Sequence, residues 1–195
     1  MPKPHLETPG LDAKKKQTRY RECDEKEREA FLSALEKIPE EKRVWVDETG
    51  MDSDEIYPYG WAPRGSRCEA QKQGNRSTRE RINLVAGLKQ DALLAPVIFS
   101  GYCDGNFFLE WIKVALIPEL AKGDVVILDN APFHPAEKIT ELLQSAGLNT
   151  LFLPRYSPRD NKIEHRWFPI KNATRKILST YADITAALHA VIIAN

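Results

Sequence analysis

The chain has 195 residues, of which 42% are hydrophobic and 29% charged, and its formal net charge at pH 7 is zero. This length suits one domain with a substantial core and is too short for two ordinary domains. The composition is that of a soluble globular protein. No run of about 18 apolar residues exists, so we expect no membrane span. The polar start of the chain lacks the apolar core of a secretory signal. We therefore expect a cytoplasmic protein, with residues 1–22 as a basic linker and residues 23–195 as one domain.

The cysteines indicate free thiols. Cys23, Cys68 and Cys103 lie far apart, and none belongs to a Cys-x-x-Cys pair. A disulfide framework or a zinc site therefore has little support.

Basic residues gather in two segments of this neutral chain. Residues 64–81 hold six basic and two acidic side chains, and residues 155–176 hold seven basic and two acidic ones. Together they predict a face for a polyanion. An ordinary solvated surface explains the same pattern equally well.

The first part of the chain predicts a helix, a meander of strands and a second helix. Residues 24–37 place apolar side chains at helical spacing, and Pro39 ends that helix. Proline and glycine in residues 57–67 indicate a turn or hairpin. Asp104 is a suitable N-cap for a helix over residues 104–120. Short runs of β-formers predict strands at residues 43–48, 82–89 and 93–101.

The second part alternates strand and helix. We predict strands at residues 125–130 and 149–154, joined by a helix at 135–146 that Gly147 caps. A final helix begins near Asp160. Strand–helix–strand order implies parallel pairing. The fold class is therefore α/β, a mixed five-stranded sheet with three antiparallel and then two parallel strands, flanked by helices. This order fits a ribonuclease-H-like fold.

Two of the predicted strands run into a carboxylate, Asp47 in one case and Asp129 in the other. In α/β sheets, ligands bind beyond the carboxyl ends of parallel strands. If these strands are neighbours, the two acids face each other and repel unless a cation lies between them. Oxygen ligands of this kind suit Mg²⁺ or Mn²⁺. The alternative is that each acid forms a turn, or that Asp129 caps the next helix.

A third acid, Glu164, lies in the first turn of the last predicted helix, beside the apolar stripe that faces the sheet. A glutamate at this place is also commonly a surface residue favoured by the helix dipole. The three acids make a D…D…E set with 34 residues between Asp129 and Glu164.

Four stretches, VDETG, YGWAPRG, LDNAPFH and LPRYSPRDNKIEHRW, occur in this order. Their combination resembles the catalytic domain of mariner-superfamily DDE transposases, and is most similar to the bacterial insertion-sequence branch of these mobile-element proteins. The resemblance covers roughly residues 20–180 and implies a ribonuclease-H-like fold.

This resemblance implies that Asp47, Asp129 and Glu164 are the catalytic residues and hold two divalent cations, Mg²⁺ or Mn²⁺. The implied activity is DNA end cleavage and strand transfer by in-line phosphodiester displacement, with no covalent protein–DNA intermediate. The implied partners are transposon ends and target DNA, usually at a TA dinucleotide. A homodimer that pairs two ends is also implied. The implied location is the bacterial cytoplasm, at the nucleoid.

Neighbouring residues receive supporting roles from the same resemblance. Asn130 and His134 are expected to orient water or a phosphate beside Asp129, and Asn161 to pin the loop before Glu164. The remaining candidates are expected to bind DNA, mostly through its phosphates, although Trp61 could equally pack in the core or the hairpin. They are Trp61, Arg64, Arg76, Arg79, Arg155 and Lys171.

The chain also departs from the family pattern. Arg159-Asp160 stands where the family has Asp-Leu, so we interpret Asp160 as a helix cap rather than a metal ligand. Pro169 is expected to kink or end the last helix. Nothing before residue 24 is predicted to form the helix-turn-helix modules of the family. A separate helix-turn-helix polypeptide from an upstream frame is therefore a possible partner.

Two other functions fit the sequence. One is a non-catalytic DNA-binding or assembly module derived from a transposase. The other is a stand-alone ribonuclease-H-like nuclease without joining activity. The complete D…D…E set favours the enzyme.

Overall fold

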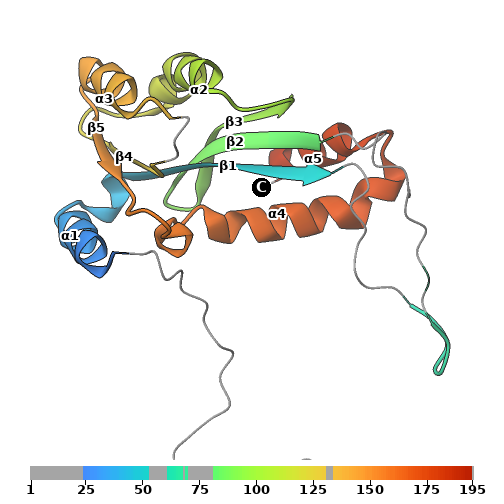
Figure 1. Cartoon of the computed structure of the whole chain (residues 1–195). Coiled ribbons are helices and arrows are strands. Elements are labelled where there is room, and N and C mark those ends of the chain that lie inside the picture. The colour runs from blue at the N-terminus through green and yellow to red at the C-terminus, as the bar shows by residue number, and fades with distance from the viewer. Residues whose placement is uncertain (1–23, 53–60, 68, 70–80, 131–133, 195) are drawn as a thin grey trace, which may run out of the picture.

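The strand-forming segments build one mixed sheet in the order β3-β2-β1-β4-β5. A computed structural model describes residues 24–52, 61–67, 69, 81–130 and 134–194 (Figure 1). The three antiparallel strands are β1 (Arg43–Asp52), β2 (Arg81–Lys89) and β3 (Ala92–Ser100). The two parallel strands, β4 (Val125–Leu128) and β5 (Asn149–Phe152), extend the sheet from the other edge of β1. The predicted strand arrangement is confirmed.

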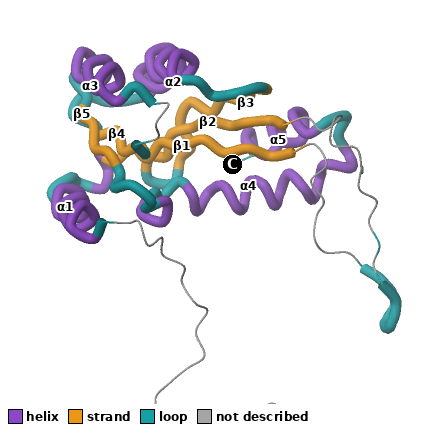
Figure 2. Tube along the Cα trace, viewed as in Figure 1, coloured by secondary structure: helices purple, strands orange, loops and turns teal. Residues whose placement is uncertain are grey.

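Helices cover both faces of this sheet (Figures 1 and 2). On one face lie α2 (Gly105–Trp111) and α3 (Ala136–Ser145), and on the other lie α1 (Glu25–Glu36), α4 (Glu164–Ile177) and α5 (Ile184–Ile193). Successive residues of a strand point to opposite faces. Val44 and Val46 of β1 therefore pack with α2 and α3, whereas Trp45 packs with α4 and α5.

Two predicted helix boundaries are confirmed by their capping contacts. The Asp104 carboxylate accepts hydrogen bonds from the backbone N–H groups of Asn106 and Phe107, at 3.0 and 2.8 Å. At the end of α3, Gly147 takes a φ of 75°, in the left-handed region that favours glycine. These contacts satisfy backbone groups that a helix end leaves without partners.

The helix predicted over residues 104–120 changes its hydrogen-bonding pattern partway. After α2 the chain continues as a π turn, Ile112–Leu116, and a short 3-10 turn, Ile117–Glu119. Pro118 lacks a backbone N–H, so an α-helical ladder cannot run through this position.

The C-terminal region differs most from the prediction. A 3-10 turn at Pro158–Asp160 comes first, and α4 begins only at Glu164. Pro169 lies inside α4 and does not end it. The helix continues to Ile177, and Ile170 and Thr174 beyond the proline are buried. The last helix, α5, was not predicted. Its residues are apolar on almost every side, so they lack an amphipathic period.

The interpretation of Asp160 as a helix cap is wrong. Its carboxylate accepts two hydrogen bonds from Arg28 of α1, from Nε at 2.7 Å and Nη2 at 2.9 Å. The N-cap of α4 is Ile163. Asp160 therefore ties α1 to the loop that leads into α4.

Some predictions fall on other parts of the chain. The proposed linker, Cys23, Cys68 and residues 57–60 lie outside the described residues. Residues 61–67 contain the predicted turn, in which Ser66 N donates to Pro63 O at 2.9 Å. Cys103 has the predicted free thiol. Of the helices described, none has the length and apolar character that crossing a membrane requires.

Candidate active site

Asp47 and Asp129 lie side by side because β1 and β4 are adjacent parallel strands. The register pairs Trp45 with Ile127, and each acid follows two residues later. The predicted adjacency is confirmed, but the strand predicted at residues 43–48 is longer than expected. β1 continues to Asp52 because its other edge still pairs with β2. Asp47 therefore projects from the middle of a paired strand, and Asp129 from the end of a short one.

The three predicted acids line one cavity of about 250 Å³. Glu164 enters it as the first residue of α4, and Asn161, from the preceding loop, also lines the wall. The alternative in which Asp129 caps the next helix is wrong: within the described residues, Pro135 is the N-cap of α3 and no side chain caps that end. The tertiary structure thus gathers the D…D…E set around one space.

The Asp47 carboxylate is poorly solvated and close to other negative charges. Burial is the main cause that raises its pKa to about 7, and the carboxylates of Glu164, Glu48 and Asp129 add to it. A hydrogen bond from Trp167 Nε1 to Asp47 Oδ2, at 2.9 Å, acts in the opposite direction. Trp167 belongs to the apolar stripe predicted to face the sheet, and no local pattern indicated that its indole N–H bonds Asp47.

Glu164 shares this electrostatic environment. Burial raises the pKa of its carboxyl group, and the charge of Asp129 raises it further. Lys171 and His165 oppose the shift. Lys171, a predicted phosphate contact, thus lies near enough to Glu164 to act on its charge.

His134 bridges two carboxylates on the other side of Asp129. Its Nδ1 lies 3.0 Å from Asp129 Oδ1 and its Nε2 lies 3.0 Å from Glu48 Oε1. Burial of the ring would lower its pKa, but these two carboxylates raise it to about 9. Glu48 was not among the predicted site residues, because it follows Asp47 directly and points to the opposite face of β1.

The two predicted asparagines lie in different environments. Asn161 is 2% exposed, and its Nδ2 donates to the backbone oxygen of Val46 at 3.2 Å. This bond ties the loop before α4 to the residue that precedes Asp47. Asn130 is exposed at the end of β4.

The donor chemistry of the site fits a divalent cation, but the acids do not form a closed ligand cluster. Among the residues that the structure describes, no three His, Cys, Asp or Glu side chains stand close enough to hold one metal ion. Asp47 and Asp129 nevertheless line a common cavity with Glu164, and the buried Asn161 Oδ1 there has no hydrogen-bond partner. Such a cavity, rich in oxygen atoms and short of positive charge, suits Mg²⁺ or Mn²⁺.

The predicted DNA-binding residues are dispersed. Trp61 is fully exposed, so the alternative in which it packs in the core is wrong. Arg64 and Arg155 are exposed as well, and Lys171 is half-buried on α4. Arg76 and Arg79 lie outside the described residues.

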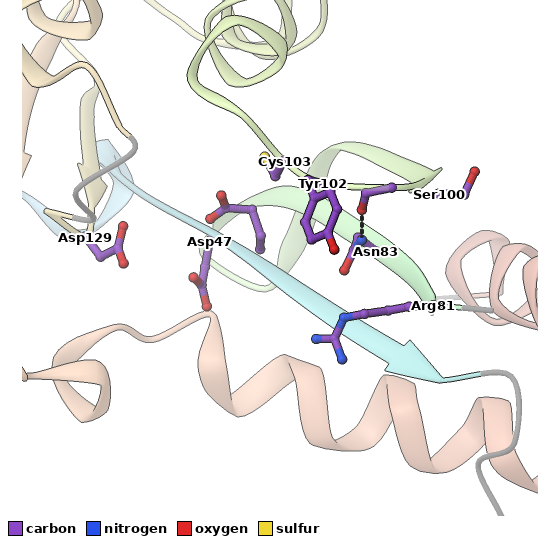
Figure 3. A pocket seen from close by; sticks show the side chains of 9 residues that line it. Asp47, Arg81, Asn83, Ser100, Tyr102, Cys103 and Asp129 are labelled. Atoms are coloured by element: carbon purple, nitrogen blue, oxygen red, sulfur yellow. Dashed lines mark hydrogen bonds between the residues drawn. The ribbon is translucent and has the colours of Figure 1, made fainter. Parts of the chain in front are cut away.

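A second cavity, of about 590 Å³, adjoins the acids and continues along β1 and β2. Figure 3 shows Asp47 and Asp129 at one end of it, with Tyr102 and Arg81 farther along. Tyr102 is 98% exposed. Gly50 makes room for the arginine, because a Cβ atom at position 50 would lie 2.5 Å from Arg81 Nη2.

Comparisons with known proteins identify the family and the fold of the chain. A family model described as "DDE superfamily endonuclease" matches residues 42–185. No curated protein matches the sequence.

Three solved structures illustrate the likeness in fold. The Mos1 strand transfer complex is 14% identical, with a TM-score of 0.60 over 95% of this chain and 64% of that chain. The Mos1 mariner paired end complex with Mg is 12% identical, with a TM-score of 0.59 over 96% of this chain and 65% of that one. The catalytic domain of Mos1 mariner transposase is also 12% identical, with a TM-score of 0.51 over 78% and 72% of the two chains.

The chain therefore spans about two thirds of the Mos1 chains in those complexes. At these identities the likeness concerns the fold, and it confirms the predicted ribonuclease-H-like transposase fold. Together with the family match, it confirms the resemblance to mariner-type DDE transposase domains. The bacterial branch stays a prediction.

Proposed function

Since the chain belongs to the DDE superfamily endonucleases, we propose that it cleaves the DNA ends of a mobile element and transfers them to a target. The reaction is an in-line displacement at a phosphodiester, in which water attacks first and a DNA 3′-hydroxyl attacks later. One observation carries the proposal: Asp47, Asp129 and Glu164 come from three separate elements and line one cavity. The chain is a transposase-type catalytic domain, and the proposed reaction needs no nucleophilic serine or tyrosine.

The charge of the site supports a metal requirement. Burial and three neighbouring carboxylates raise the pKa of Asp47 to about 7, so the three acids carry their full charge at low cost only with cations among them. Asp47, Asp129 and Glu164 would hold Mg²⁺ or Mn²⁺ there, and the ions would supply positive charge to the oxygens of the displacement. Trp167 and Asn161 keep the acids in place.

The second cavity offers a path for the DNA strand. Arg81 suits a phosphate, and the exposed ring of Tyr102 suits an unpaired base, because aromatic side chains stack on bases of any sequence. Lys171 on α4, Arg155 in the preceding loop, and Trp61 and Arg64 in the predicted hairpin add contacts of the same kind. In the full reaction we propose a homodimer that pairs two transposon ends, a TA target and a separate helix-turn-helix polypeptide as partner.

The experiment uses two DNA substrates, a supercoiled plasmid and a duplex with a pre-cut transposon end, each with Mg²⁺ or Mn²⁺. Cleavage and joining by the wild type, lost in Asp129→Asn, support the proposal. The matched control is Asp91→Asn, an exposed aspartate in the turn between β2 and β3. Activity that survives in Asp129→Asn contradicts the assignment of the site.

One observation favours a second function, that of a DNA-binding or assembly module without catalysis. The three acids of the described structure stand too far apart to hold one ion together. DNA retention without any cleavage, at saturating Mn²⁺, would select this function over the enzyme.

A further inference from the structure

Asp129 needs an orienting contact more than Asp47 does. Asp47 lies inside β1, where it pairs with Ala86 of β2, and its carboxylate receives the Trp167 hydrogen bond. Asp129 instead follows the last residue of β4, and its side chain is 48% exposed. The contact at its carboxylate is the imidazole of His134, whose Nδ1 lies 3.0 Å from Oδ1.

Besides Asp129, two side chains hold the imidazole of His134. The residue is 6% exposed, and its ring stacks on Phe108 with centroids 4.1 Å apart and planes 16° from parallel. Its other nitrogen, Nε2, lies 3.0 Å from Glu48 Oε1. Stacking fixes the plane of the ring, and Glu48 fixes its rotation within that plane.

Hydrogen-bond chemistry makes Glu48 necessary to this arrangement. An ionised carboxylate can only accept, so each ring nitrogen that faces one must donate. Without Glu48, the buried Nε2 loses its acceptor, and a buried polar atom without a partner costs about 1–3 kcal/mol. The ring would then turn or shift to recover a partner, and its hold on Asp129 would weaken.

We propose that Glu48 is a positioning residue of the acid site, because it holds His134 and thereby orients the carboxylate of Asp129 for cation binding. Adjacent residues of β1 then serve both strand-borne acids: Asp47 enters the cavity directly, and Glu48 acts on Asp129 from the opposite face of the sheet. This inference rests on the proposed function, because that function requires the cation that Asp129 binds.

The test is a titration of the full chain with Mn²⁺ alone, followed by electron paramagnetic resonance, with thermal unfolding measured in parallel. Glu48→Ala is expected to lower Mn²⁺ affinity about 10–100-fold, the range found for partners of metal ligands. His134→Asn is expected to match it. Glu41→Ala, at an exposed position shortly before β1, is the control and is expected to keep wild-type affinity.

Two conservative variants separate positioning from other roles. Glu48→Gln is expected to remain closer to wild type than Glu48→Ala, because its amide can donate to Nε2 while Nδ1–H still donates to Asp129. Glu48→Asp keeps the charge but is one methylene shorter, so it is expected to lose affinity. If Glu48→Ala fails to fold, Glu48→Asp is the variant that tests the inference.

Three results would overturn the inference. A lower unfolding temperature of Glu48→Ala with unchanged Mn²⁺ affinity would make the contact merely structural. An equal loss in Glu48→Gln and Glu48→Ala would make Glu48 a direct ligand. A wild type that binds Mn²⁺ no better than Asp129→Asn would remove the metal site itself, and the proposed function with it. In the first two cases the proposed function stands.

Discussion

Two carboxylates near opposite ends of β4, Asp124 before its start and Asp47 of β1 beside its far end, have opposite electrostatic settings. At its start, Asp124 is completely buried, with Lys89 Nζ at 2.6 Å and Lys42 Nζ at 3.4 Å. Burial acts to raise its pKa, but the Lys89 bond, the Ala121 N–H and Lys42 together hold that pKa below its usual value. Beyond its other end, Asp47 meets three carboxylates and one indole N–H, and its pKa rises to about 7.

This difference separates structural acids from functional ones. Asp124 has its counter-charges built into the chain, so its ion pairs hold the loop before β4 to the sheet. Within the described residues, Asp47 and Glu164 have no ion pair of that kind, and the imidazole of His134 beside Asp129 is shared with Glu48. The fold therefore keeps the three acids together against their mutual repulsion. An acid cluster of this type suits cations from solution.

The largest expected effect is on catalysis by Asp47→Asn. The substitution removes a carboxylate that is proposed to hold a cation at the reacting phosphate, so cleavage of plasmid DNA in Mn²⁺ is expected to fall by at least about 10²–10³-fold, the usual loss for one preorganised group. Its thermal stability is expected to equal or exceed that of wild type, because a poorly solvated charge has gone. A large loss of stability in Asp47→Asn would contradict the contrast drawn between Asp47 and Asp124.

Asp124→Asn is expected to behave in the opposite way. Removing one partner of a buried ion pair costs about 3–5 kcal/mol, and we expect the lower end because Lys89 and Lys42 still reach water. Urea unfolding measures this loss. Cleavage by the remaining folded protein is expected to stay at the wild-type level, and a selective loss of activity would show that the two ends are coupled.

Mn²⁺ is expected to stabilise the wild type. At a concentration of about 100 times Kd, binding adds about 2.7 kcal/mol to the free energy of unfolding, which a thermal shift detects. Asp129→Asn is expected to show no shift, whereas Asp124→Asn is expected to show the full shift from its lower starting point. An equal shift in both variants would place the ion elsewhere.

The pH dependence of metal-free protein is expected to show a smaller effect, because neighbouring carboxylates share protons. The folded-state pKa of Asp47, about 7, lies above its ordinary value of 3.8, so the folded protein binds the extra proton. Its contribution to stability is therefore lost as pH rises from about 4 to 7. Asp124, with a lowered pKa, contributes stability that is lost only as pH falls below its ordinary value.

Subtracting the Asp47→Asn curve from that of wild type isolates this effect. His134 adds a second pH window, because its pKa of about 9 lies above the ordinary histidine value of 6.5. Its contribution is complete below about 6.5 and is lost as pH rises through about 9. A flat difference curve between pH 4 and 7 would contradict the environment described for Asp47.

The smallest expected effect is that of Arg81→Ala on DNA binding. Loss of one phosphate contact is expected to weaken binding uniformly across sequences and to reduce the salt slope by about one. Fluorescence anisotropy at several salt concentrations measures both. The control is a neutral substitution of Lys138, which is exposed on α3. Arg43→Ala is unsuitable as a control, because Arg43 donates hydrogen bonds to the backbone oxygens of Ile38 and Leu35.

Much of the fold followed from local patterns. Short runs of β-forming residues predicted all five strands of the sheet, and Asp104 and Gly147 predicted the ends of their helices. The length of β1 did not follow, because its second half is held by pairing with β2 rather than by its own composition. The helix α5 was missed because a helix that is apolar on most sides has no amphipathic period.

The site divides in the same way. The D…D…E set and its motifs were readable along the chain, and so was the expectation that two of the acids meet at adjacent strands. Asp160 was misread, because its partner Arg28 lies 132 residues away. The Trp167 bond to Asp47 joins residues 120 apart, so no local pattern contains it.

The sequence by itself determined the order of strands and helices, the three acids and the family, because these depend on side-chain periodicity and on motifs that stay together along the chain. Only the tertiary structure decided which groups surround each acid. Glu48 and His134 are 86 residues apart, and they meet because the register of β1 against β4 sets which side chains share a face. The tertiary structure also gave Asp124 two lysines and Asp47 three neighbouring carboxylates, and this contrast supports the proposed metal site.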